Sequence, residues 1–170
     1  MAQPWQNRIT RYGEEAPDQL LANPRNFRTH PGSQTDALSG VLREVGIVQN
    51  VIVNERSGFV VDGHARIALA LREGQPTIPV TYVDLSDAEE AEILATLDPL
   101  AAMAGTDTAK LEVLLADVSS GEPAIQAMLA QMAEEAGLQA PDITFPEYDE
   151  STTDDVKYCE CPNCGHKFPK

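Results

Sequence analysis

Residues 60–70, VVDGHARIALA, form the stretch that decides the fold of this chain. Two valines typical of a strand lead into Asp62 and Gly63, and the periodic apolar residues that follow predict a helix beginning at His64. Free backbone N–H groups and the helix dipole favour an anion at such an N-terminus. The guanidinium of Arg66 adds a fork that suits phosphate or carboxylate. The alternative interpretation is an ordinary strand-to-helix turn with Arg66 in solvent.

The segments on either side of this stretch predict a compact mixed α/β unit. Apolar spacing marks a helix over residues 38–45, with Ser33 or Thr35 as its cap and Gly46 after its end. The remaining elements are a hairpin over 48–61, the helix over 64–73 ending at Gly74, and a strand over 79–83.

The second half of the chain is predicted to be helical. Ser86 and Glu89 have the spacing of a capping box at the start of a helix. We expect this helix to break at Asp98-Pro99, because proline lacks a backbone donor. Ala/Leu-rich segments at 100–118 and 122–137 then predict two further helices, separated by Ser-Ser-Gly at 119–121.

Charge is distributed unevenly along the 170 residues, whose net charge is −15. Residues 1–80 carry eight Arg and eight Asp/Glu, whereas residues 81–156 carry eighteen Asp/Glu and the single Lys110. So acidic a segment repels a DNA backbone, which excludes a nonspecific duplex clamp there. A solvated helical surface is the favoured interpretation of this segment, and a partner-binding surface is the alternative.

The chain is expected to divide into one α/β domain with appendages. Neither a run of about 20 apolar residues nor a secretory signal pattern occurs, so we expect a cytoplasmic protein without a membrane span. The expected parts are an arm or short edge strand at 1–16, a domain at 17–104, an acidic helical subdomain at 105–139, an acidic linker at 140–156 and a tail at 157–170.

All three cysteines lie in the tail, which indicates a metal site rather than a disulfide framework. Cys161 and Cys164 have the spacing of a zinc knuckle, and Cys159 and His166 are the local candidates for the other ligands. A second copy of the tail, or a histidine of the main domain (His30 or His64), could complete the set instead. A metal-free tail is the alternative.

The order of these signals resembles the ParB/sulfiredoxin-like domains over residues 17–104. The opening block LLANPRNFRTHP at 20–31 is similar to the family's Asn-Pro turn followed by Arg, and ALSGVLREVG at 37–46 to its first helix. Residues 60–70 are similar to its Gly-x-x-Arg phosphate box. The resemblance implies a ParB/sulfiredoxin-like mixed sheet with helices.

The resemblance also implies a nucleotide site, because ParB clamps bind CTP and free-serine kinases and sulfiredoxins bind ATP or ADP. The residues implied to hold phosphate are Arg25, Arg28, Gly63, His64 and Arg66. Asp62 would assist Mg²⁺ or orient a hydroxyl, so Asp62 and His64 are the candidate catalytic residues.

Three departures from the family pattern favour binding over catalysis. Phe59 occupies the position at which CTP-hydrolysing members carry Glu, and Ala65 replaces the second His of the free-serine kinase box. The absence of any Cys before residue 159 excludes sulfiredoxin chemistry.

Residues 93–104, ILATLDPLAAMA, are similar to a helix and break in ParB-like proteins of phages and mobile elements, which are often encoded beside or fused to DNA methyltransferases. The resemblance implies a CTP- or ATP-binding module with Mg²⁺ in a DNA-associated system of a phage or mobile element. The implied partner is a protein of DNA modification or partition, such as a DNA methyltransferase, with weak or indirect DNA contact and a possible homodimer. The alternative function is a small phosphotransferase or nucleotidase.

Overall fold

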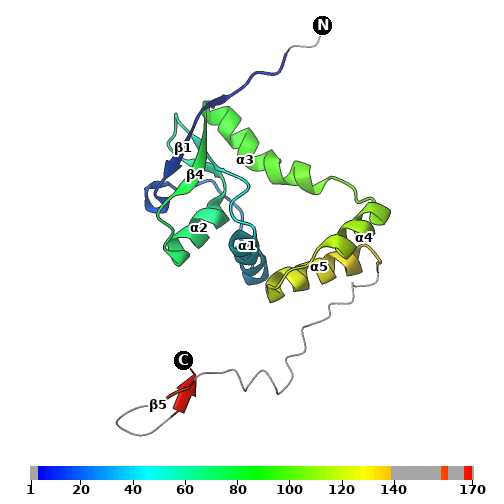
Figure 1. The fold of residues 1–170 in the computed structure, drawn as a ribbon. Coiled ribbons are helices and arrows are strands. Elements are labelled where there is room, and N and C mark those ends of the chain that lie inside the picture. The colour runs from blue at the N-terminus through cyan, green and yellow to red at the C-terminus, as the bar shows by residue number, and fades with distance from the viewer. Residues whose placement is uncertain (1–3, 139–157, 161–166, 170) are drawn as a thin grey trace.

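The computed structural model describes residues 4–138, 158–160 and 167–169 (Figure 1). Its main sheet has the order β1-β4-β2-β3. The strands are β1 (Ile9–Glu15), β2 (Val51–Asn54), β3 (Val60–Asp62) and β4 (Ile78–Val83). β2 runs parallel to β4, and the other two pairs are antiparallel. The expected mixed sheet and the hairpin are confirmed, and β1 shows that the N-terminal segment forms an edge strand.

The core lies between this sheet and the helix α2 (His64–Glu73). Alternate residues of β4 are buried, as expected for a strand with one face toward the core. On α2 the buried residues are Ile67, Leu69 and Ala70. The cluster that joins the two elements consists of Val51, Val53, Val60, Ile67, Ala70, Ile78, Val80 and Tyr82. The apolar run on each side of Asp62-Gly63 therefore packs against the same core.

The helix α1 (Gly32–Glu44) begins earlier than its expected caps allow. Pro31 occupies the cap position, and Thr35 lies inside the first turn, where its hydroxyl donates to the carbonyl of Gly32 at 2.8 Å. Ser33 is also helical, so the predicted caps are wrong. The predicted bounds of α2 are correct, and it ends at Gly74 in the left-handed conformation.

The helix α3 (Asp87–Ala102) continues through Pro99, so the predicted break at Asp98-Pro99 is wrong. Pro99 removes the N–H that would bond the carbonyl of Ala95. Ala95 is exposed, so water can satisfy that carbonyl. The break lies instead at residues 103–107, where Asp107 caps the next helix by accepting from the N–H of Lys110 at 3.2 Å.

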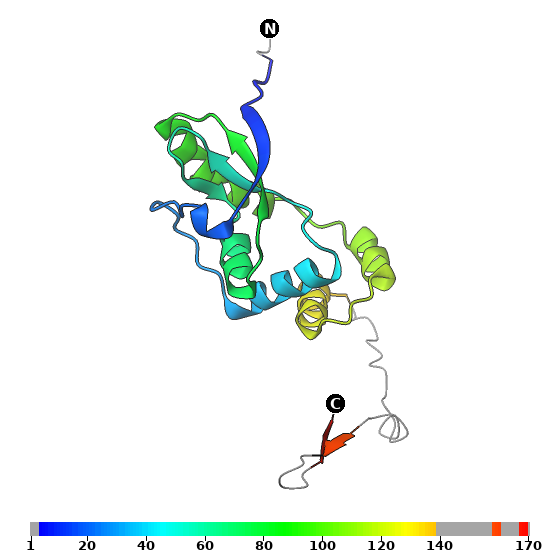
Figure 2. The same cartoon turned by 60° about the vertical axis from the view of Figure 1, so that its left-hand side comes forward.

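Of the last two helices, the second packs on α1 and the first packs on the second. They are α4 (Thr108–Asp117) and α5 (Pro123–Glu135), separated where the Ser-Ser-Gly segment predicted. Both views place α5 alongside α1 (Figures 1 and 2). A Cβ added to Gly40 of α1 would lie 3.1 Å from the side chains of Glu122 and Ile125. The small residue at position 40 thus allows the two helices to approach closely.

A second, two-stranded sheet joins β5 (Tyr158–Glu160) to β6 (Lys167–Pro169) in antiparallel pairing, with Glu160 opposite Lys167. The whole predicted linker at 140–156, together with Cys161, Cys164 and His166, lies outside the described residues. Within the part of the chain that the structure describes, no helix is both long enough and apolar enough to cross a membrane.

Candidate functional site

The turn between β3 and α2 leaves the N-terminus of α2 without a side-chain cap. Gly63 is the cap residue, with φ of +100°. A Cβ at this position would lie 2.9 Å from Cγ2 of Val51 and 3.2 Å from Nη2 of Arg66. Glycine is therefore required both by the backbone conformation and by the close approach of β2. As a result, α2 begins at His64, and no cap side chain accepts a hydrogen bond from the backbone N–H groups of its first turn.

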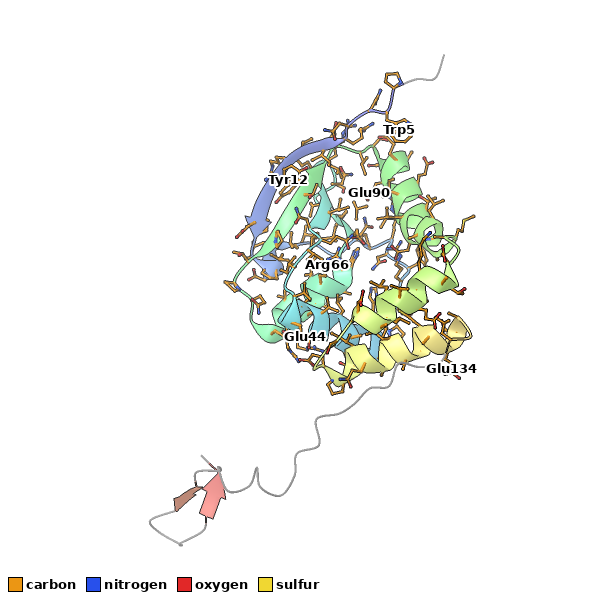
Figure 3. All side chains as sticks on the ribbon, turned by 45° about the vertical axis from the view of Figure 1, so that its right-hand side comes forward. Trp5, Tyr12, Glu44, Arg66, Glu90 and Glu134 are labelled. Atoms are coloured by element: carbon orange, nitrogen blue, oxygen red, sulfur yellow. The ribbon has the colours of Figure 1, made fainter. Side chains whose placement is uncertain are left out.

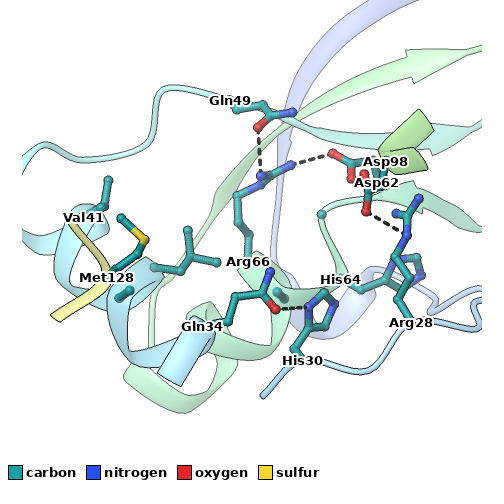
Figure 4. A pocket seen from close by; sticks show the side chains of 14 residues that line it. Arg28, His30, Gln34, Val41, Gln49, Asp62, His64, Arg66, Asp98 and Met128 are labelled. Carbon is teal, nitrogen blue, oxygen red and sulfur yellow. Dashed lines mark hydrogen bonds and ion pairs between the residues drawn. The ribbon is translucent and has the colours of Figure 1, made fainter. Parts of the chain in front are cut away.

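This helix N-terminus borders a cavity of about 380 Å³ (Figure 4). The volume falls within the range typical of small-molecule sites. Its wall combines an apolar side with a polar side that includes the start of α2. The lining residues are Arg28, His30, Gln34, Ala37, Leu38, Val41, Gln49, Asp62, Gly63, His64, Ala65, Arg66, Asp98 and Met128. The structure thus brings Arg28 and the predicted phosphate box together in one cavity.

Arg66 is held by partners within the cavity wall rather than by solvent. Its side chain is 14% exposed, and Nη2 pairs with Oδ2 of Asp62 at 2.7 Å. Nη1 donates to the side chain of Gln49 at 3.1 Å, and Nη2 donates to the carbonyl of Asn50 at 3.3 Å. Nε is buried with no hydrogen-bond partner among the described residues. Arg66 is therefore fixed in position, and the interpretation of a solvated turn residue is wrong.

Arg28 enters the cavity from the first loop and is held by α3. Its side chain is also 14% exposed, and its Nε pairs with Oδ2 of Asp98 at 2.8 Å. No sequence pattern singles out Asp98, which lies 70 residues from Arg28 at the expected helix break. The two arginines and the two aspartates of the lining balance in formal charge. An anionic ligand must therefore compete with carboxylates for both guanidinium groups.

His64 is held as a neutral imidazole. Its Nε2 accepts a hydrogen bond from the backbone N–H of Asn23 at 3.2 Å. Burial is the main cause of a lowered pKa for His64, and the charges of Arg28 and His30 lower it further. The carboxylate of Asp62 opposes the shift. At neutral pH the ring therefore contributes a hydrogen-bond donor and no positive charge.

Arg25 is not among the residues that line the cavity. Its guanidinium donates instead to Glu90 and to the carbonyl of Asp87, both at 3.3 Å. Glu90 is another residue that the sequence analysis did not single out. Phe59 also lies outside the lining, where it bridges to Leu21, whereas Ala65 lies in the cavity wall.

Of the candidate zinc ligands, only Cys159 belongs to the part of the chain that the structure describes. Cys161, Cys164 and His166 lie outside the described residues, and for Cys159 only its backbone place in β5 is described. Across residues 4–138, no group of three His, Cys, Asp or Glu side chains could hold a metal ion on its own.

Comparisons with known proteins agree with the fold. No family model and no curated protein matches the chain. The C-terminally truncated chromosome-partitioning protein ParB of Caulobacter crescentus, in complex with CTP-γ-S, matches with a TM-score of 0.50 and 22% identity over 77% of this chain and 73% of that chain. A pNOB8-like ParB N-domain matches with a TM-score of 0.45 and 14% identity over 98% of this chain and 56% of that chain. The likeness to the Caulobacter protein shows that this chain has a ParB-like fold.

Proposed function

We propose that this chain is a nucleotide-binding module that takes a nucleoside triphosphate, CTP or ATP, into the cavity at the start of α2. The observation that carries the proposal is the convergence of Arg28, Arg66 and an uncapped helix N-terminus on one cavity. These groups have the chemistry that recognises phosphate. The fold supports the same proposal, because the Caulobacter ParB that shares it is in complex with CTP-γ-S.

The balanced charges of the cavity favour a ligand that arrives with a cation. When phosphate oxygens replace Asp62 on Arg66 and Asp98 on Arg28, two carboxylates are left without partners. Mg²⁺ is usually held by one or two carboxylates together with phosphate oxygens, so these residues fit it. Mg²⁺ would supply charge neutralisation at the phosphates. The chain's own contribution is that Arg28 and Arg66 exchange their aspartate partners for phosphate oxygens.

Binding is favoured over phosphate transfer by the composition of the cavity wall. Asp62 would be the base or the metal ligand in a phosphotransferase, and it is equally a Mg²⁺ ligand in a binding module, so its presence does not separate the two functions. Ala65, which replaces a histidine of the kinase box, lies in the cavity wall and offers no polar side chain. A phosphotransferase or nucleotidase remains the alternative function.

The acidic second half favours action through a protein partner in the cytoplasm. Residues 81–156 carry eighteen Asp/Glu against one Lys, so direct contact of this part with DNA is unfavourable. The proposal is therefore a module of a phage or mobile-element system for DNA modification or partition, with a methyltransferase as one candidate partner and with homodimerisation possible.

The tail is proposed to hold a structural Zn²⁺. The strands β5 and β6 pair with Glu160 opposite Lys167, and the sequence between them contains Cys161, Cys164 and His166. Cys159 lies in the preceding strand. Thiolates at this spacing suit a tetrahedral zinc site. One zinc per chain, lost in Cys161→Ser, supports this part of the proposal, and a zinc-free purified protein contradicts it.

The test of the main proposal is calorimetric titration of CTP, ATP and ADP, with and without Mg²⁺, into the wild type and Arg66→Ala. Saturable binding of one nucleotide is expected, with at least a tenfold loss in the variant. Arg72→Ala is the matched control, because Arg72 lies exposed near the other end of α2. Asp98→Asn should bind nucleotide a few-fold more tightly without Mg²⁺, because it frees Arg28. Failure of all three nucleotides to bind contradicts the proposal, and rapid hydrolysis favours the enzymatic alternative.

A further inference from the structure

Glu90 is a buried carboxylate that the proposed binding does not use. It lies in the first turn of α3, is 2% exposed, and faces the sheet (Figure 3). Oε1 accepts from Nδ2 of Asn23 at 2.9 Å and from Nη2 of Arg25 at 3.3 Å. Oε2 accepts from Nδ2 of Asn54 at 2.6 Å and from the hydroxyl of Ser57. The carboxylate therefore fastens the first loop and the β2–β3 hairpin to one helix.

These hydrogen bonds keep the carboxylate ionised although it is buried. Burial by itself raises the pKa of Glu90, but the donors of Ser57, Asn54 and Asn23 together outweigh it, and the pKa lies below its ordinary value. An ionised acceptor makes stronger hydrogen bonds than a neutral one. The attachment of the loop at Asn23 is correspondingly firm.

Asn23 connects this cluster to the cavity. Its side chain is fixed at both ends, since Nδ2 donates to Glu90 and Oδ1 accepts from the backbone N–H of Arg25 at 3.0 Å. The same residue, 4% exposed, directs its own backbone N–H at Nε2 of His64, 3.2 Å away. A backbone N–H can only donate, so Nε2 must be the unprotonated nitrogen of the ring.

The free nitrogen of His64 is then a donor. A neutral imidazole that accepts at Nε2 carries its proton on Nδ1. Nδ1 makes no hydrogen bond to a described residue, and His64 lines the cavity. The ring can therefore donate to a ligand oxygen there, beside the uncapped N-terminus of α2.

We propose that Glu90 is a positioning residue: by fixing Asn23 it holds His64 in the tautomer protonated at Nδ1, ready to donate to the ligand. The effect on nucleotide affinity rests on the proposed function, whereas the tautomer does not. A purely structural role of Glu90 in joining α3 to the loop and the hairpin is the alternative. The two roles differ in the tautomer of His64 that is expected when the contact of Glu90 with Asn23 (the loop branch) or with Ser57 (the hairpin branch) is removed.

The test is long-range ¹H–¹⁵N NMR of the histidine rings at pH 7.5, with His64 assigned by His64→Gln. The wild type is expected to show His64 protonated at Nδ1. Asn23→Ala cuts the branch toward the loop and should produce a mixture of tautomers. Ser57→Ala removes a donor to the same carboxylate on the hairpin branch and should retain the wild-type tautomer. Urea unfolding shows that each variant is folded.

Three results overturn the proposal: a wild-type His64 protonated at Nε2, an unchanged tautomer in Asn23→Ala, or an equal change in both variants. The wild-type spectrum decides the first without any substitution, so misfolding of Asn23→Ala does not remove the test. Asn23→Ala is expected to lose nucleotide affinity roughly tenfold, which is about the effect of one hydrogen bond to the ligand. Ser57→Ala is expected to lose none. If the wild type binds no nucleotide, the proposed function fails while the tautomer result still decides the role of Glu90.

Discussion

The helices α2 and α3 begin in opposite ways. At α3, Ser86 accepts from the N–H of Glu89, and the carboxylate of Glu89 accepts from the N–H of Ser86, so the helix begins with a complete capping box. Arg8 adds an ion pair to Glu89 at 2.7 Å. At α2 the cap residue is Gly63, and no side chain caps the helix.

This difference indicates which helix N-terminus has backbone N–H groups available to bind an anion. The backbone N–H groups of the two helix ends have the same chemistry, but at α3 the hydroxyl of Ser86 accepts from one of them, the N–H of Glu89. Those of α2 lie beside the cavity that Arg28 and Arg66 line. A helix end that the chain leaves uncapped beside two arginines is the better place to look for an anion.

The largest expected effect comes from Gly63→Ala, which disturbs the uncapped N-terminus of α2 (the open helix end). The variant combines a positive φ with a Cβ 2.9 Å from Val51, and it should destabilise the protein by about 3 kcal/mol and abolish nucleotide binding. Gly74→Ala is the matched control, because Gly74 also has a positive φ but nothing within 4 Å of the added Cβ. Gly74→Ala should lower the free energy of unfolding by about 1–2 kcal/mol and leave nucleotide binding intact. Urea unfolding and calorimetry measure both, and equal losses of stability would contradict the packing argument.

A smaller effect is expected from Ser86→Ala, which removes the side-chain cap from the N-terminus of α3 (the closed helix end). Loss of the cap should lower the free energy of unfolding by about 1 kcal/mol. Nucleotide affinity should stay unchanged, because Ser86 is not among the residues that line the cavity. Thermal unfolding and the same titrations test this. If affinity falls as far as in Gly63→Ala, the two helix ends are not functionally distinct.

Local features of the sequence predicted both helix ends, whereas contacts over long sequence distances were not predictable. The capping box and the Gly63 turn are set by residues within three or four positions of each other. The pair of Arg28 with Asp98 joins residues 70 positions apart, and Asn23 meets Glu90 across 67. Nothing in the periodicity of α3 marks one carboxylate as buried and another as a cavity residue. Only the folded sheet brings these partners together.

The continuation of α3 past Pro99 was missed for a related reason. Local propensity predicts a break there, since proline removes one helical hydrogen bond. The structure retains the helix, with Ala95 exposed on it and Asp98 paired to Arg28. The local rule for proline therefore does not decide where this helix ends.

The smallest effect concerns the pH dependence of the closed helix end. Hydrogen bonds from the backbone and hydroxyl of Ser86, and then from Arg8, lower the pKa of Glu89 from 4.5 to about 2. Because the folded pKa is the lower one, the ionised carboxylate stabilises the fold fully above about pH 4.5, and this stabilisation is lost as the pH falls toward 2.

Glu89→Gln removes this titration while keeping the shape of the side chain. The difference in free energy of unfolding between wild type and variant should be constant above pH 5 and should narrow steadily below pH 4.5, as measured by urea unfolding from pH 6 to pH 3. In an Arg8→Ala background the difference should be smaller throughout, because one source of the low pKa is gone. A difference that does not change down to pH 3 would mean that Glu89 does not cap the helix as a carboxylate. The closed end of α3 would then owe its stability to Ser86 alone.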